Sequence, residues 1–338
     1  MRVLTAAGTL LALAGVLVVG PLANSEAGAA EGPIATKSAK LELVSNSRIR
    51  SEPNLVAQRA TVECPGRLDP YGGAQFADPD PRPNNGEGVY PHSYERLGAQ
   101  RGFHSTPVLF DPTLGDGTRS YQVTLQVLCG KKPGKIADPH DIAVNVPVGR
   151  TVTLVATCPK KSVLIGGGFQ RAAWEANGGV VAYESHAISK KHWQATGTAF
   201  GAYGTDFVSI GYCMASPKRK PLVEEVSNSV AIAPGRVGFT TTPPCSPRRR
   251  LIWTGFDTNP KTGNFQGTLF ADGIINGDNT FTASAYNNSG GAGTLTAYGY
   301  CMKNKVIGGS LKKFSKKVGR LDTNESTNKP DQDGNPNG

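Results

Sequence analysis

The sequence is poor in aromatic residues and lacks the pattern of an amphipathic helix. Aromatic residues make up 7% of its 338 residues, and after residue 30 the apolar residues alternate with polar ones instead of recurring at helical spacing. Gly, Thr, Ser and Val are plentiful, which is typical of short strands joined by turns. Composition and pattern together predict an all-β protein.

Motifs of the common catalytic and metal sites are also missing. The sequence has no Gly-x-Ser-x-Gly and no His-Glu-x-x-His, no two cysteines have the spacing of a structural zinc site, and the glycines of 166–168 do not form a nucleotide-binding fingerprint. The histidines are scattered: His92, His104, His140, His186 and His192. We therefore expect no catalysis, no cofactor and no metal. A hydrolase is the alternative, because triads and carboxylate pairs assemble in space rather than in sequence.

A long apolar run occurs at the start of the chain and nowhere else in the sequence. Arg2 precedes an apolar core, and residues 27–29 (Ala-Gly-Ala) form a small-residue cleavage site. These features predict a signal peptide over 1–29 and a secreted, extracellular protein with no transmembrane segment after cleavage. The alternative is an uncleaved anchor, since 3–22 is almost long enough to span a bilayer.

Two stretches of the chain repeat each other, one from Cys158 to Cys213 and the other from Cys245 to Cys301. Gly-Phe follows the first cysteine at equal distance in both, and Gly-Tyr-Cys-Met closes both. Trp193 in the earlier stretch has the same place as Phe281 in the later one. A fixed period with matched cysteines is typical of a repeat architecture.

A more divergent first copy runs from Cys64 to Cys129. Its glycine position holds Gly72-Gly73, and counting back from Cys129 assigns Leu109 to the place of Trp193. Residues 41–47 (Leu-Glu-Leu-Val-Ser-Asn-Ser) resemble 223–229 (Val-Glu-Glu-Val-Ser-Asn-Ser) ahead of the third copy. We therefore expect 41–47 to open the first unit.

Cysteines of an exported protein pair in an oxidising compartment. The repeat selects the pairs Cys64–Cys129, Cys158–Cys213 and Cys245–Cys301. On the chain-entropy model, each bridge removes about 4 kcal/mol of unfolded-state entropy, which supports units too small to bury a large core.

The predicted fold is all-β, with three tandem disulfide-stapled β-sandwich-like repeats in a pseudo-threefold arrangement. The expected parts are a signal peptide (1–29), a mobile leader (30–40), three β-repeats (41–130, 137–215 and 222–303) and a basic, then disordered tail (304–338).

The second unit resembles a β-repeat of secreted actinobacterial proteins with the pattern Cys-Pro…Gly-Gly-Gly-Phe…Trp…Tyr-Cys. The residues that carry the likeness are Cys158, Pro159, Gly166 to Phe169, Trp193, Tyr212 and Cys213. The third unit departs from it at Ser246 and at Trp253-Thr254. The resemblance implies architecture and export, and no activity. A more distant likeness is to adaptor subunits of secreted multi-protein toxin particles.

The first unit is longer than the others, and the extra residues are expected in a Pro-rich loop over 78–96. This loop offers Tyr90, His92, Tyr94 and Arg96 as candidate binding residues. Calcium at Asp78, Asp80 and Glu87 is an alternative that the prolines disfavour. A plain surface loop is another.

Two tryptophans outside the repeat pattern, Trp174 and Trp253, are further binding candidates, with burial against a neighbouring unit as the alternative. A basic end over 303–320 contributes Lys312, Lys313, Lys316 and Lys317, either on a solvated tail or on a basic helix against an anionic surface. The formal net charge of +10 favours anionic partners.

These observations favour a secreted, non-catalytic binding or adaptor protein. The expected partner is another secreted protein or an anionic cell-envelope polymer, in the former case within a multi-protein, toxin-like assembly. Nucleic acid is disfavoured, because the basic clusters lack interleaved aromatics. The main alternative is a glycan-binding lectin, whose sites should recur in each unit, whereas an adaptor site can occur in one unit.

The signal peptide gives the first testable prediction. N-terminal sequencing of the protein from culture medium is expected to begin at Ala30. A protein that starts at Met1 and sediments with membranes would contradict cleavage.

Overall fold

The structure is a computed structural model. It describes residues 56–57, 60–78, 88–97, 101–110, 120–130, 135–171, 178–201, 204–215, 223–262, 266–303 and 312–322. Several parts named above lie outside these residues: the expected signal peptide and leader, the segment 41–47, Asp80, Glu87, Trp174 and the end of the tail (323–338). The described residues form strands and no helix, so the all-β prediction is confirmed. In particular, this part of the chain has no helix long and apolar enough to cross a membrane.

Each unit contributes a similar series of strands. The first unit holds β1 (Val56–Ala57), β2 (Ala60–Glu63), β3 (Asp69–Asp78), β4 (Gly88–Leu97), β5 (Gly102–Phe110) and β6 (Ser120–Gly130). The second holds β7 (Ile136–Ala137), β8 (His140–Val146), β9 (Thr151–Thr157), β10 (Ser162–Arg171), β11 (Gly178–Ala187), β12 (His192–Gly201) and β13 (Thr205–Ala215). The third holds β14 (Glu224–Ile232), β15 (Val237–Thr241), β16 (Arg249–Asn259), β17 (Thr268–Ile275), β18 (Phe281–Asn287) and β19 (Gly293–Lys303). A last strand, β20 (Lys312–Asp322), follows.

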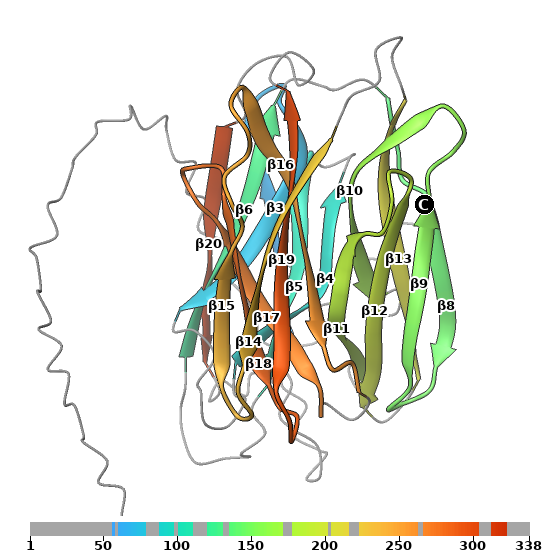
Figure 1. Ribbon diagram of the computed structural model, residues 1–338, viewed down its shortest axis with the longest axis vertical. Helices are drawn as coiled ribbons and strands as arrows, with labels where there is room; N and C mark the ends of the chain where they lie inside the picture. The colour runs from blue at the N-terminus through green and yellow to red at the C-terminus, as the bar shows by residue number, and fades with distance from the viewer. Residues whose placement is uncertain are drawn as a thin grey trace, which may run out of the picture. The chain divides into compact units, whose positions relative to one another are not determined.

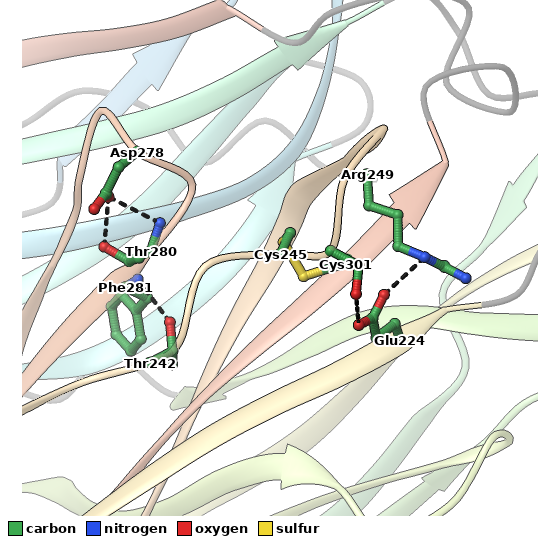
Figure 2. The surroundings of a disulfide bond; sticks show 9 residues. Glu224, Thr242, Cys245, Arg249, Asp278, Thr280, Phe281 and Cys301 are labelled. Carbon is green, nitrogen blue, oxygen red and sulfur yellow. Dashed lines mark hydrogen bonds and ion pairs between the residues drawn. A yellow bond between two sulfur atoms is a disulfide. The ribbon is translucent and has the colours of Figure 1, made fainter.

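The three disulfides join Cys64 to Cys129, Cys158 to Cys213 and Cys245 to Cys301, the pairs that the repeat predicts. All six cysteines are described, and none is free. In the third unit the bridge lies beside an ion pair in which Arg249 Nε contacts Glu224 Oε2 at 2.7 Å (Figure 2).

Strand pairing after the first cysteine has the same register in each unit. β3 pairs with β6, β10 with β13 and β16 with β19, all antiparallel. Each ladder has a bulge at one place, after Pro70, Leu164 and Leu251, which are equally far from their cysteines. These registers define which residues of the units are equivalent. A pseudo-threefold axis that relates the units stays a prediction.

Sheets are shared between units, so the units are not separate sandwiches. β4 of the first unit pairs with β10 of the second, through Tyr94 and Phe169. β11 of the second pairs with β16 of the third, through Ser185 and Phe256. β17 of the third lies beside β3 of the first, where the Ala77 amide donates to Asp272 Oδ2 at 2.9 Å. We call these three places the first–second, second–third and third–first seams.

The expected loop over 78–96 is wrong at both ends. Asp78 closes β3, and residues 88–97 form β4, which pairs with β5 across a bulge. Prolines do not prevent this, because Pro91 lies next to the bulge, where a missing N–H is tolerated. The part between these strands, 79–87, lies outside the described residues.

The basic end was also expected to be a tail or a helix, and this is wrong for 312–322. β20 pairs antiparallel with β6, with Lys312 opposite Cys129 (Figure 1). In the third unit the same place, opposite Cys301, belongs to Glu224 of β14, which comes directly before that unit. The C-terminal strand therefore provides the outer strand that the sequence assigns to residues 41–47.

β18 and β19 follow each other in the chain but belong to different ladders, since β18 pairs with β15 and β17, whereas β19 pairs with β14 and β16. One expectation drawn from the repeat is wrong. The aromatic equivalent to Trp193 in the first unit is Phe103 rather than Leu109. Both rings lie on equivalent glycines, since a Cβ on Gly167 would meet Trp193 and one on Gly73 would meet Phe103.

The core is continuous across all three units, and Trp193, Phe103 and Phe281 are completely buried in it. Trp253 is 1% exposed and belongs to the same core. It occupies the place of Gly72 and Gly166 in the other units, and a Cβ on either glycine would collide with Trp253. Its Nε1 donates to the Gly167 carbonyl at 2.6 Å.

The packing of Trp253 predicts a loss of stability when the ring is removed. Trp253→Ala is expected to lower the free energy of unfolding by about 3–5 kcal/mol, because it leaves a cavity between strands of three units. Denaturant unfolding measures this, with Phe239→Ala as control, since Phe239 is 48% exposed on β15. Equal effects of the two substitutions would contradict the central role of Trp253.

Candidate functional site

Most predicted binding residues that the structure describes are buried. Tyr90 and Tyr94 on β4 are each 2% exposed. The Tyr94 hydroxyl donates to the Gly73 carbonyl at 2.8 Å, and burial raises the pKa of Tyr94 above its ordinary range. Trp253 is buried as described above. These three residues are core residues, so their prediction as contact residues is wrong, whereas the alternative for Trp253, burial against a neighbouring unit, is confirmed.

The other predicted binding residues have different positions. Arg96 is half-buried, and its Nε donates to the Pro70 carbonyl at 2.8 Å. His92 is in β4 and the four lysines are in β20, but their side chains, like Trp174 as a whole, lie outside the described residues. The members of the predicted set whose side chains are described do not form one exposed surface.

A group of charged side chains lies at the second–third seam. Glu184 on β11 is directly opposite Asp257 on β16, and the two carboxylates would repel each other. Lys261 lies between them, with its Nζ 2.8 Å from Glu184 Oε2 and 2.7 Å from Asp257 Oδ1. His186 Nε2 is 2.7 Å from Glu184 Oε1. We call these four residues the ion-pair cluster.

Glu184 is 3% exposed and has further polar partners on β12. Gln194 Nε2 donates to its Oε1 at 2.5 Å, and the Thr196 hydroxyl donates to its Oε2 at 2.9 Å. Burial by itself raises the pKa of Glu184, but hydrogen bonds from His186 and Lys261 and the charges of both bring it down to about 2. Burial tends to lower the pKa of Lys261, but Asp257 and Glu184 raise it overall. The cluster is therefore a fixed, charged network.

Ligand atoms of Glu184, His186 and Asp257 lie within 4.8 Å of one another, as in a metal site. The ammonium of Lys261, however, lies in contact with both carboxylates, at the place where a cation would bind them. The ion-pair cluster is thus compensated by the protein's own cation.

The cluster does not recur at the other seams. By the strand registers, Ser93 and Gln170 have the places of Glu184 and Asp257 at the first–second seam. At the third–first seam, Asp272 corresponds to Glu184, but its carboxylate accepts from the Ala77 amide and the Ser284 hydroxyl. Among the described residues, two facing carboxylates that share one lysine occur at the second–third seam and at neither of the other two.

A pocket of about 310 Å³ opens beside the cluster. It lies where β10, the turn between β11 and β12, β14 and β19 meet. The side chains that line it include Ile165, Ala187, Ile188, Trp193, Glu225 and Tyr300. Trp193 and Tyr300 are buried and form its inner wall, whereas Ile188 is 47% exposed and Glu225 is exposed at the rim. We call it the junction pocket.

One hydrogen bond at the junction pocket has a counterpart at each seam. The Ala187 amide donates to the Tyr300 hydroxyl at 2.8 Å, and the Arg96 amide donates to the Tyr212 hydroxyl at 2.7 Å. At the third–first seam, the tyrosine is replaced by Leu128, and Gln126 Oε1 accepts from the Ile275 amide at 2.6 Å. Position 187 is therefore equivalent to 96 and 275. Ala187 lines the pocket, and the other seams have arginine and isoleucine at the equivalent position.

The sequence alone did not reveal this site. Glu184 and His186 are close in the chain, but Asp257 and Lys261 are far from both, and the four residues fit no spacing motif. The signal that could have found them is the departure from the repeat, since charged residues occur here where the equivalent positions are mostly neutral.

No protein-family model matches this chain, and no curated protein matches it. The function is therefore inferred from the geometry of the site.

The low pKa of Glu184 predicts how stability changes with pH. When folding lowers the pKa of a carboxylate, that group stabilises the folded protein at any pH above its pKa in the unfolded chain. The stabilisation is lost as the pH falls towards the lower pKa of the folded state. Glu184→Gln is expected to cost about 2 kcal/mol at pH 7, and its difference from the wild type should shrink as the pH falls from about 4.5 towards about 2. Thermal melts across this range measure it, with Glu63→Gln on β2 as control. A difference that stays constant would show that the network is not ionised.

Proposed function

We propose that this chain is an exported, non-catalytic binding protein with one site, at the second–third seam, for a secreted protein partner. The observation that carries the proposal is the asymmetry of three equivalent places. The junction pocket and the ion-pair cluster lie side by side at one seam, whereas arginine and isoleucine fill the equivalent places of the other two. A surface that is present at one seam and differs from the other two is suited to binding one partner molecule per chain.

The charge state of the cluster supports binding over hydrolysis. A general acid or base needs a pKa near the working pH. The pKa of Glu184 is about 2 and that of Lys261 is raised, so neither exchanges a proton near neutral pH. All six cysteines are paired, which removes a thiol nucleophile.

The alternatives fit the site less well. A lectin built on repeats would present similar pockets in each unit, but the place of Ala187 is taken by Arg96 and Ile275 at the other two seams. An anionic envelope polymer was favoured by the basic end, and residues 312–322 of it are now assigned to β20 against β6. We therefore favour binding of a protein partner, either alone or as part of a multi-protein, toxin-like assembly. The three disulfides are consistent with an extracellular place of action.

Capture from culture medium of the producing cells tests this proposal. The immobilised mature chain is expected to retain one protein at fixed stoichiometry. Ile188→Asp, at the rim of the junction pocket, should abolish retention, because a charge replaces an exposed apolar contact. Phe239→Asp is a matched control, since the two side chains are 47% and 48% exposed.

Three outcomes would contradict the proposal. Retention that Ile188→Asp leaves unchanged would exclude the junction pocket. Specific binding of the chain to a glycan array would favour the lectin, and turnover of a substrate would favour the hydrolase.

A further inference from the structure

The first–second seam shows what side chain fits the place of the junction pocket. There Arg96 turns inward from the end of β4, and its Nε donates to the Pro70 carbonyl at 2.8 Å. Burial lowers the pKa of Arg96, while Tyr212 and the carboxylates of Asp69 and Asp138 raise it. The guanidinium thus bonds a carbonyl and lies in the electrostatic field of Tyr212 and of acidic groups from its own unit and the second unit.

The junction pocket repeats most of these surroundings without the arginine. Leu164 is equivalent to Pro70, because both precede the bulge of their ladders. Tyr300 is equivalent to Tyr212. Trp193 is equivalent to Phe103, since both lie on equivalent glycines. Leu164, Trp193 and Tyr300 all line the pocket.

The acidic group is repeated as well. Ala137 lies opposite Cys213, and Glu224 lies opposite Cys301. The next residues, Asp138 and Glu225, are therefore equivalent, and Glu225 lines the junction pocket. Asp69 has no acidic counterpart, because Val163 stands in its place.

From this equivalence we propose that the junction pocket binds an arginine side chain of the protein partner, in the way that the first–second seam holds Arg96. This inference rests on the proposed function and names the group that the partner inserts. The Leu164 carbonyl accepts from the guanidinium, Glu225 pairs with its charge, and the rings of Trp193 and Tyr300 form the wall against which it packs.

The electrostatics of the pocket agree with a cationic ligand. Partial burial raises the pKa of Glu225, with a smaller opposing effect of His186, so the carboxylate gains from a bound cation. Lys190 is the other charged residue of the lining, and it is exposed and free to turn towards solvent. Arginine is preferred to lysine here, because its planar group can bond a carbonyl and a carboxylate at the same time.

Titration with short peptides tests the inference without the partner. Ac-Gly-Arg-Gly-NH₂ is expected to shift the NMR signal of the Trp193 indole in the mature chain, with saturation. The citrulline peptide, which has nearly the same shape but no charge, should bind about tenfold more weakly or worse. The lysine peptide should also bind more weakly.

Variants place the binding in the pocket. Ala187→Arg and Ala187→Ile introduce the side chains of the other two seams, and both should abolish peptide binding. Glu225→Gln should weaken it about tenfold, whereas Glu63→Gln removes the same charge from β2 and should leave it unchanged. Because Glu225 is exposed, its variant is expected to fold even if a substitution at Ala187 does not.

The outcomes separate this inference from the proposed function. Equal binding of the arginine and citrulline peptides, equal binding of the lysine peptide, or full binding to both Ala187 variants would overturn the arginine site. If Ile188→Asp still abolishes capture of the partner in that case, the proposed function stands and the arginine does not. If the peptide binds as expected but no partner is captured, the arginine site stands and the proposed function falls.

Discussion

The packing of Trp253 against two glycines is the constraint on which the rest of the structure depends. Gly72, Gly166 and Trp253 have equivalent places after the bulge of β3, β10 and β16. A Cβ on either glycine would lie within 3 Å of Trp253. One large ring therefore fills the space that two missing side chains leave, and three Trp or three Gly would overfill or empty it. The core is therefore closed by residues that differ between the units.

The same principle of unlike copies explains the candidate site. At the first–second and third–first seams this position holds a large side chain, Arg96 or Ile275. At the second–third seam the equivalent residue is Ala187. We propose that an arginine of the partner occupies the pocket there, beside the Leu164 carbonyl, the Glu225 carboxylate and the rings of Trp193 and Tyr300. The backbone hydrogen bond at these positions is retained through Tyr212, Tyr300 or Gln126. The fold and the site are thus separable, because the backbone hydrogen bond is kept at all three seams while the side chain at the same position differs.

Several features could be predicted because they depend on local pattern or on the repeat. The disulfide pairs follow from matched cysteines, and the burial of Trp193 follows from the aromatic at the same place in the third unit. Other features could not. Leu109 was assigned in place of Phe103 because counting from Cys129 ignores extra residues within the unit, whereas packing on Gly73 decides the register. Tyr94 was expected on a surface loop, and for Trp253 binding and burial against a neighbouring unit both stayed open, because the sequence does not show which residues of another unit cover them.

By itself, the sequence determined the strand class and the cysteine pairs, because alternation and spacing can be read from the chain without its contacts. Tertiary structure alone decided that neighbouring units share sheets, that β20 completes the first unit beside β6, and that β18 and β19 belong to different ladders. It also decided that Glu184, Asp257 and Lys261 meet and that Ala187 opens a pocket. Each of these depends on contacts between residues distant in the chain. Such contacts produce no periodic pattern in the sequence of the segments that make them.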